Sequence, residues 1–247
     1  MGKAVSSNRR RKKPARATSI GPLANIIAQQ KFPVIYIDPP WRFKTYNEKG
    51  RERLPDYKPP INGAAARHYD TMALGDMKAL PVGDIAADDC ALLMWVTFPM
   101  IPEALELIAA WGFKFKTVAF TWMKRNAKTP SMFIDSNDLF KGTGYWTMAN
   151  AEIVFLATRG QPKRKNKDVV QAIFSPRREH SRKPDEVYER IERLFDGPYL
   201  EMFSRTSREG WTSWGNQTQK FPTLKSKSGQ RGDPVTPASR PGKRKKS

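Results

Sequence analysis

The sequence predicts an α/β protein built around a Rossmann-like sheet with helices on both of its faces. Short runs of β-forming apolar residues alternate along the chain with amphipathic segments of helical spacing, which is the pattern of this fold class. The run Val-Ile-Tyr-Ile at 34–37 is apolar without interruption, as expected of a parallel strand buried on both faces. A chain of 247 residues is long enough for one domain of ordinary size with a sizeable core.

The expected elements alternate along the chain. Strands are expected at 34–38, 91–97, 115–122, 152–157 and 199–203, and helices near 74–80, 102–111 and 184–195. Pro102 and Gly112 provide start and stop signals for the second helix. Pro184 suits the first turn of the third helix, whose residues Val187 and Ile191 are spaced for one buried face. Two long segments, 42–68 and 124–150, are expected as loops, and long loops in a compact domain are usually functional or mobile.

An acidic residue, two prolines and a tryptophan directly follow the first expected strand, as Asp38-Pro39-Pro40-Trp41. In open α/β sheets ligands bind beyond the carboxyl ends of the strands, so Asp38 stands where a catalytic group belongs. The same residues are also compatible with a simple turn that closes the strand, because Pro-Pro pairs are common in loops.

These residue types suit chemistry on the exocyclic amine of adenine. That nitrogen is a poor nucleophile because its lone pair is delocalised into the ring, and two hydrogen-bond acceptors can hold it pyramidal. The carboxylate of Asp38 can supply one acceptor, and the carbonyl of Pro39, fixed by the rigid Pro-Pro pair, can supply the other. Trp41 offers a flat face on which an extracted base can stack. This chemistry needs no metal.

Further motifs make residues 31–219 resemble the N6-adenine methyltransferase family of the eukaryotic mRNA adenosine methyltransferase catalytic subunit and its bacterial and phage relatives. Besides Asp38 to Trp41, these motifs are His68-Tyr69-Asp70-Thr71-Met72, Leu93-Met94-Trp95-Val96-Thr97, Gly144-Tyr145-Trp146, His180-Ser181-Arg182-Lys183-Pro184-Asp185-Glu186 and Trp214-Gly215-Asn216-Gln217. The resemblance implies a methyltransferase sheet with a circularly permuted motif order, in which the catalytic motif comes early in the chain and the cofactor motif late.

The resemblance also implies S-adenosylmethionine as the cofactor. The catalytic residues would be Asp38, Pro39, Pro40 and Trp41, and the residues that match cofactor-binding positions are Asp38, Lys183, Phe203, Arg205, Asn216 and Gln217. One stretch departs from the family pattern. After Phe203 the family often has Gly-Arg-Pro-His-Asn, whereas this chain has Ser-Arg-Thr-Ser-Arg at 204–208, so the His and Asn contacts to ribose are not expected here.

The two expected loops combine basic and aromatic residues, which suits a strand of nucleic acid with an everted base. The residues expected to bind the substrate are Trp41, Arg42, Lys44, His68, Tyr69, Lys124, Tyr145 and Trp146. The alternative is that both segments are ordinary surface loops whose aromatic side chains pack onto the core.

Both ends of the chain are strongly basic. Residues 1–17 hold seven Lys and Arg and no acid, residues 220–247 hold nine with one acid, and together they carry +15 of the net charge of +20. We therefore expect a catalytic domain at 18–220 between basic disordered arms at 1–17 and 221–247. Such arms suit a phosphate backbone, but the same clusters could serve nuclear targeting or simply be solvated tails.

Two histidines and one cysteine, Cys90, are too few for an ordinary zinc site or a disulfide framework. No apolar run approaches a membrane span and no signal peptide is evident, so a cytoplasmic protein of a bacterium or a phage-infected host is expected, or a nuclear one in a eukaryote.

The sequence thus predicts an S-adenosylmethionine-dependent N6-adenine methyltransferase with a nucleic-acid substrate and no metal. DNA is expected rather than RNA, because the motif that runs from His180 to Glu186 is similar to the compact bacterial or phage branch, for which DNA is the usual inference. The alternatives are an RNA N6-adenosine methyltransferase and a non-catalytic nucleic-acid-binding subunit.

Overall fold

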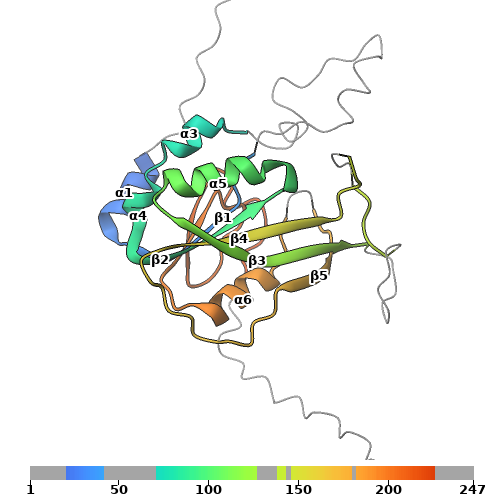
Figure 1. The fold of residues 1–247 in the computed structure, drawn as a ribbon. Helices are drawn as coiled ribbons and strands as arrows, with labels where there is room; N and C mark the ends of the chain where they lie inside the picture. The colour runs from blue at the N-terminus through green and yellow to red at the C-terminus, as the bar shows by residue number, and fades with distance from the viewer. Residues whose placement is uncertain (1–20, 42–70, 127–137, 143–145, 180–181, 226–247) are drawn as a thin grey trace, which may run out of the picture.

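The computed structural model describes residues 21–41, 71–126, 138–142, 146–179 and 182–225. Seven strands form one sheet in the order β5-β3-β4-β2-β1-β6-β7 (Figure 1). The strands are β1 (Phe32–Ile37), β2 (Ala86–Val96), β3 (Lys114–Arg125), β4 (Ala151–Arg159), β5 (Ala172–Pro176), β6 (Tyr199–Met202) and β7 (Trp211–Trp214). The helices are α1 (Gly21–Gln29), α3 (Leu74–Lys78), α4 (Val82–Ile85), α5 (Ile101–Ala110) and α6 (Glu186–Leu194), and a 3-10 turn, η2 (Phe98–Met100), precedes α5.

One strand runs against the other six. β1 pairs in parallel with β2 and β6, β6 with β7, and β3 with β5, whereas β4 is antiparallel to both β2 and β3. The carboxyl ends of six strands therefore share one edge of the sheet with the amino end of β4. Strands from the start and the end of the chain, β1 and β6, lie side by side in the sheet, which fits the permuted motif order that the family resemblance implies.

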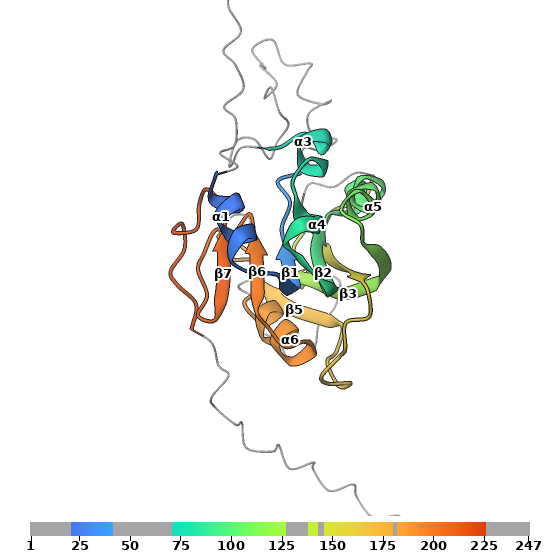
Figure 2. The ribbon, with the colours of Figure 1, turned by 90° about the vertical axis from the view of Figure 1, so that its left-hand side faces the viewer.

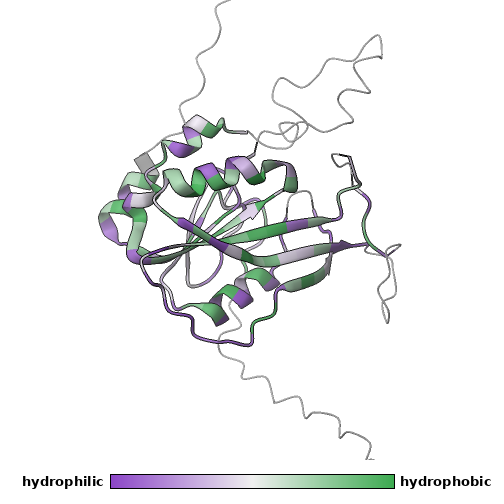
Figure 3. Cartoon of the chain, in the orientation of Figure 1, coloured by the Kyte–Doolittle hydropathy of each residue, from purple (hydrophilic) through white to green (hydrophobic). Residues whose placement is uncertain are grey.

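The sheet separates two hydrophobic clusters. Along β2, Leu92 and Met94 face one cluster while Leu93 and Trp95 face the other, with the two-residue period of a strand buried on both sides. The first cluster takes in residues of α1, α3, α4 and α5, and the second takes in residues of α6. Figures 1 and 2 show α5 and α6 on opposite sides of the sheet, and Figure 3 shows hydrophilic and hydrophobic residues alternating along α6. The fold class and the helices on both faces are therefore confirmed.

The five expected strands and three expected helices are all present, with shifts of a few residues at their ends. Among the described residues, four helices and strands were not predicted, α1, α4, β5 and β7, and neither was the 3-10 turn η2. Each is short or weakly patterned; β7, for example, has only two buried tryptophans in four residues. The segment 124–150 is not one loop, because β3 extends to Arg125 and isolated bridges join Arg125 to Leu139 and Gly142 to Ala149.

Residues 221–225, which the sequence assigned to the basic tail, are hydrogen-bonded to the domain. The amide of Phe221 donates to the carbonyl of Arg205 at 3.1 Å, and the amide of Leu224 donates to the carbonyl of Ser207 at 2.8 Å. These five residues therefore pack with the segment after β6. The division into a domain and two arms stays a prediction, since 1–20 and 226–247 lie outside the described residues.

Cys90 is fully buried, and burial raises the pKa of its thiol to about 12. Cys90 therefore packs as a small core side chain.

Candidate active site

A lysine joins two carboxylates at the edge where the parallel strands end. Asp38 directly follows β1, Glu152 is the second residue of β4, and Lys183 lies just before α6. The Nζ atom of Lys183 lies 3.3 Å from Oδ1 of Asp38 and 2.6 Å from Oε2 of Glu152, and 4.8 Å above the ring of Trp95. Because β4 runs against its neighbours, its first residues arrive at the same edge as the carboxyl end of β1.

A second lysine completes this cluster from the end of β3. The Nζ atom of Lys124 lies 2.5 Å from Oε1 of Glu152, so each oxygen of that carboxylate has its own cation. Burial alone would raise the pKa of Glu152, but Lys183 and Lys124 together lower it to about 2. Glu152 is therefore ionised at neutral pH. We call Asp38, Lys124, Glu152 and Lys183 the charged cluster.

A pocket opens beside the charged cluster, lined by side chains from β1, α6, β6 and the segments around them. Its lining residues are Tyr36, Asp38, Arg182, Lys183, Asp185, Tyr188, Glu201, Phe203, Arg205, Thr206 and Phe221. The backbone bends sharply at Phe203, which has φ 57° just after β6. Gly215 approaches this bend so closely that an added Cβ would lie 2.5 Å from the carbonyl oxygen of Ser204.

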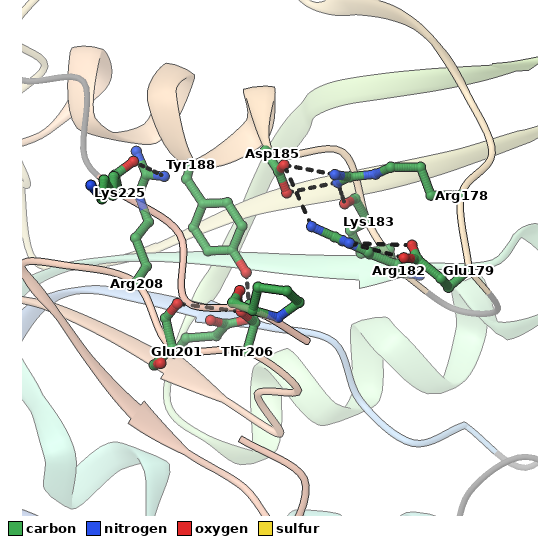
Figure 4. A network of polar contacts seen from close by, with 12 residues as sticks. Arg178, Glu179, Arg182, Lys183, Asp185, Tyr188, Glu201, Thr206, Arg208 and Lys225 are labelled. Atoms are coloured by element: carbon green, nitrogen blue, oxygen red, sulfur yellow. Dashed lines mark hydrogen bonds and ion pairs between the residues drawn. The ribbon is translucent and has the colours of Figure 1, made fainter. Parts of the chain in front are cut away.

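A buried acid forms part of the pocket wall. Glu201 is 7% exposed, and the hydroxyl of Tyr188 donates to its Oε1 at 2.8 Å (Figure 4). Its Oε2 is buried with no hydrogen-bond partner. Burial raises the pKa of Glu201, and hydrogen bonds from Tyr188 and Ser204 offset part of this rise, so that the pKa is about 7. Oε2 of Glu201 is thus a hydrogen-bond acceptor that no residue of the pocket satisfies, and a donor group on a ligand could bind to it.

Ion pairs hold the segment that carries Lys183. Arg178 makes two contacts with Asp185, at 2.7 and 2.6 Å, and donates to the carbonyl of Lys183 at 2.8 Å (Figure 4). Arg182 pairs with Glu179 at 3.1 Å. These contacts fix the chain entering α6, whose amphipathic pattern is confirmed by the buried side chains of Val187 and Ile191.

The structure brings four of the expected cofactor residues to one pocket: Asp38, Lys183, Phe203 and Arg205. Asn216 and Gln217 instead line an adjacent, open hollow after β7, together with residues 218–220. The departure at 204–208 has a structural consequence, because Arg208 turns toward α6 and pairs with Glu192 at 2.7 and 3.0 Å. It packs 5.2 Å above the ring of Tyr188 and does not line the pocket.

The motif after β1 is held tightly. The carbonyl of Pro39 accepts from the amide of Trp41 at 2.8 Å, which leaves one of its two lone pairs for a ligand. Trp41 itself is 3% exposed and its indole N–H donates to the carbonyl of Trp95 at 3.1 Å. In this arrangement the ring packs in the core, so stacking of a base on Trp41 stays a prediction.

The expected substrate residues are only partly described. Arg42, Lys44, His68, Tyr69 and Tyr145 lie outside the described residues. Lys124 belongs to the charged cluster, and Trp146 is 82% exposed. Sequence reasoning missed Glu152, Tyr188 and Glu201. The available signal was an acid inside an otherwise apolar strand, as in Ala-Glu-Ile-Val at 151–154 and Tyr-Leu-Glu-Met at 199–202.

Within the described ranges, no three His, Cys, Asp or Glu side chains gather as metal ligands would. None of the described helices is long and apolar enough to cross a lipid bilayer.

Comparisons with known proteins show the family of the chain. The MT-A70 family model matches residues 32–217. A Type II methyltransferase, M.MunI of Mycoplasma sp, is 32% identical over 215 residues, which is 83% of this chain and 86% of that protein. An N(6)-adenosine-methyltransferase MT-A70-like protein of Arabidopsis thaliana is 29% identical over 189 residues, and the human N(6)-adenosine-methyltransferase catalytic subunit METTL3 is 27% identical over 191. The chain covers 24% and 28% of the length of these two. By the family match and the similarity to M.MunI, the chain belongs to the MT-A70 family.

Proposed function

We propose that the protein is a site-specific methyltransferase that transfers a methyl group from S-adenosylmethionine to the N6 amine of adenine in DNA. The observation that carries the proposal is the place of Asp38, which directly follows β1, contacts Lys183 in the charged cluster and also lines the pocket. A carboxylate at this position can accept a hydrogen bond from an amine while a cofactor occupies the pocket beside it.

The residues of the pocket fit S-adenosylmethionine. Glu201 offers a buried, unsatisfied acceptor, while Arg205 and Lys183 bring positive charge for a carboxylate. Phe203 and Phe221 supply apolar surface for a purine, and the amides of Asn216 and Gln217 offer the paired donors and acceptors that hydroxyls and base edges need. When bound, the cofactor supplies an electrophilic methyl group on a sulfonium.

The chain's own contribution is to position and polarise the amine. Asp38 and the free lone pair of the Pro39 carbonyl accept from the two N–H groups, which directs the nitrogen lone pair at the methyl group. Positive charge would develop on N6 as it takes the methyl group from the cofactor, and the carboxylate of Asp38 would stabilise that charge. The proton that N6 loses can pass to Asp38 or to water. Lys183 orients Asp38 through the 3.3 Å contact.

DNA is favoured as the substrate because the relative that this chain matches over nearly its full length is named a Type II methyltransferase. A DNA substrate would place the enzyme in the cytoplasm of a bacterium or of a phage-infected host. RNA is the second candidate, since relatives from plants and animals are named N(6)-adenosine-methyltransferases. Those proteins are several times longer than the region they share with this chain, so their substrates carry less weight here.

The test is a transfer assay with S-adenosylmethionine labelled on the methyl group. Unmethylated plasmid DNA, its heat-denatured form and an RNA transcript of the same sequence are offered in parallel, with Asp38→Asn as the inactive control. We expect label in DNA, recovered as N6-methyladenine at one short sequence that can be mapped. Label in RNA alone would favour the second candidate, and label in none would contradict methyl transfer to nucleic acid.

A further inference from the structure

Two exposed apolar side chains lie together on the segment that joins β3 to β4. Trp146 is 82% exposed and Met148 is 62% exposed. Among the described residues, Trp146 is the most exposed of the large hydrophobic side chains. Single exposed apolar residues are common, but neighbouring ones beside a proposed active site indicate a surface for a ligand.

The backbone presents Trp146 in a conformation that bulky residues rarely adopt. Its φ is 71°, in the left-handed region. Such conformations persist where the surrounding structure imposes them, and they concentrate at ligand-binding sites. Here paired hydrogen bonds between Gly142 and Ala149, at 2.9 and 3.1 Å, close the segment. Gly142 permits this closure, because an added Cβ would lie 2.9 Å from the carbonyl oxygen of Ala149.

The same segment is anchored at the charged cluster. The amide of Phe140 donates to the carbonyl of Lys124 at 2.7 Å, and the amide of Lys124 donates to the carbonyl of Asn150 at 2.8 Å. The side chain of Lys124 contacts Glu152, which pairs with Lys183. Trp146 is three residues from Ala149, so even a fully extended chain separates them by only about 10 Å.

Exposed positive charge also lies on the segment that carries this apolar pair and against it. The guanidinium of Arg177 lies 3.8 Å above the ring of Phe140, and both Arg177 and Lys141 are exposed. Exposed cations next to exposed apolar rings complement a nucleic acid, which offers phosphates outside and bases inside. The net charge of +20 disfavours a second copy of this chain as the occupant.

We propose that Trp146, supported by Met148, is a wedge that enters duplex DNA and fills the space left when the target adenine leaves the base stack. This rests on the proposed function. An adenine in a duplex reaches Asp38 only after it is everted, and a flat apolar side chain inserted into the stack stabilises that state. The wedge makes double-stranded DNA the preferred substrate, because a single strand has no such space to fill.

The test compares Trp146→Ala with wild type on three oligonucleotides that carry the mapped sequence. They are a paired duplex, the same duplex with an abasic site opposite the target adenine, and the single strand. We expect kcat/KM on the paired duplex to fall by roughly 10- to 100-fold, the range expected when one stacking side chain is removed, and to change less than about threefold on the other two. Trp146→Phe should recover most of the activity.

Phe115→Ala is the matched control, since Phe115 is an exposed aromatic at the opposite end of β3. A second measurement places 2-aminopurine at one adenine after another in a set of duplexes, so it needs no mapped target. Its fluorescence should rise with the wild-type protein and stay low with Trp146→Ala. This arm needs binding but no methyl transfer, so it tests the wedge even if the proposed function fails.

An equal loss of activity on all three oligonucleotides would overturn the wedge. So would a change in oligomeric state of Trp146→Ala on size exclusion, which would mark the apolar pair as a subunit interface. If wild type instead methylates no DNA while 2-aminopurine still responds to Trp146, the proposed function fails and the wedge stands.

Discussion

Within the charged cluster, Lys183 lies closer to Glu152 than to Asp38. Its Nζ atom is 2.6 Å from Oε2 of Glu152 and 3.3 Å from Oδ1 of Asp38. Lys183 is therefore held mainly by Glu152, and Lys124 secures the other oxygen of that carboxylate. Asp38 therefore has a cation nearby, but the carboxylate still has lone pairs that can accept hydrogen bonds from a ligand. This arrangement leaves the Asp38 carboxylate oriented and still able to accept from a substrate amine.

Replacing Glu152 by Gln should weaken both stability and transfer. The change removes the carboxylate that two largely buried lysines share, so we expect the unfolding free energy to fall by on the order of 3–5 kcal/mol. Lys183 would then pair more closely with Asp38, and the Asp38 carboxylate would be less able to accept a hydrogen bond from the substrate amine. Urea denaturation and kcat measure the two effects. The control is Glu106→Gln, which breaks an exposed pair with Lys78 and should cost less than about 1 kcal/mol. Equal effects in the two variants would contradict a special role for Glu152.

The buried acid Glu201 should make stability fall as pH rises. Its pKa is raised from 4.5 to about 7 in the folded protein, so between these values the folded state holds a proton that the unfolded state has released. The unfolding free energy should therefore decrease across about pH 4.5 to 7, by on the order of 2–3 kcal/mol. Glu201→Gln keeps the shape without titrating. Denaturation curves at several pH values should show a flatter profile for this variant, and parallel profiles would rule out the titration of Glu201.

Glu152 should act in the opposite sense and at lower pH. Its pKa is lowered from 4.5 to about 2, so its contribution to stability is complete above pH 4.5 and is lost as pH falls toward 2. Wild type should lose stability across this acid window, and Glu152→Gln should lose less. The same denaturation series, extended to pH 2, measures the difference. An identical acid slope in both proteins would show that other carboxylates dominate there.

Asp38→Asn should abolish most of the transfer without unfolding the protein. The substitution keeps the size of the side chain but replaces one accepting oxygen by a donor and removes the charge that stabilises the amine. We expect kcat to fall by about 10² to 10³. The melting temperature should stay close to that of wild type. A correctly folded variant with near wild-type turnover would show that Asp38 is not the acceptor.

Much of the site could be predicted because its chemistry sits in contiguous motifs. The run 34–37 and the motif at 38–41 place a carboxylate at a strand end from local pattern alone, and β1 ends at Ile37 as that requires. Glu152 and Glu201 were missed because their one local signal, an acid inside an apolar strand, is also produced by an acid that faces solvent. Their roles depend on partners, Lys183 and Tyr188, that only the pairing of distant strands brings near.

Trp41 shows that residue type alone does not predict whether a side chain is accessible to a ligand. A flat ring after the catalytic prolines suits base stacking by residue type, but its accessibility is set by packing. The ring is buried against β2 through the 3.1 Å hydrogen bond to the Trp95 carbonyl. Likewise, β5 and β7 escape detection because they are only five and four residues long, and each pairs with a single neighbouring strand, β3 or β6.

Alanine at Asn216 should weaken cofactor binding. The hollow that Asn216 lines follows β7, the neighbour of β6, and its amide is proposed to bond the cofactor. Without these hydrogen bonds the affinity for S-adenosylmethionine should fall by about 1–3 kcal/mol, or roughly 5- to 150-fold. Calorimetry on the free protein measures this. Asn166→Ala is the control, since Asn166 bonds the carbonyl of Arg193 at the far end of α6. Unchanged affinity in Asn216→Ala would contradict the assignment.

The last prediction concerns the basic ends, and the structure decides where to cut. Residues 221–225 are hydrogen-bonded to 205–209, so a deletion that begins at 221 would remove these bonds, whereas one that begins at 226 keeps all of them. Removing 1–17 and 226–247 should leave the melting temperature and the turnover at saturating DNA nearly unchanged, because Asp38 and the pocket stay intact. Affinity for duplex DNA should fall, and the log–log salt dependence should flatten by about 0.9 for each phosphate that the ends no longer neutralise. The companion deletion from 221 should lower the melting temperature, since it also removes the hydrogen bonds to Arg205 and Ser207. Full-length affinity and salt slope in the shorter deletion would show that the ends do not hold DNA, and would assign binding to the segments that flank the charged cluster.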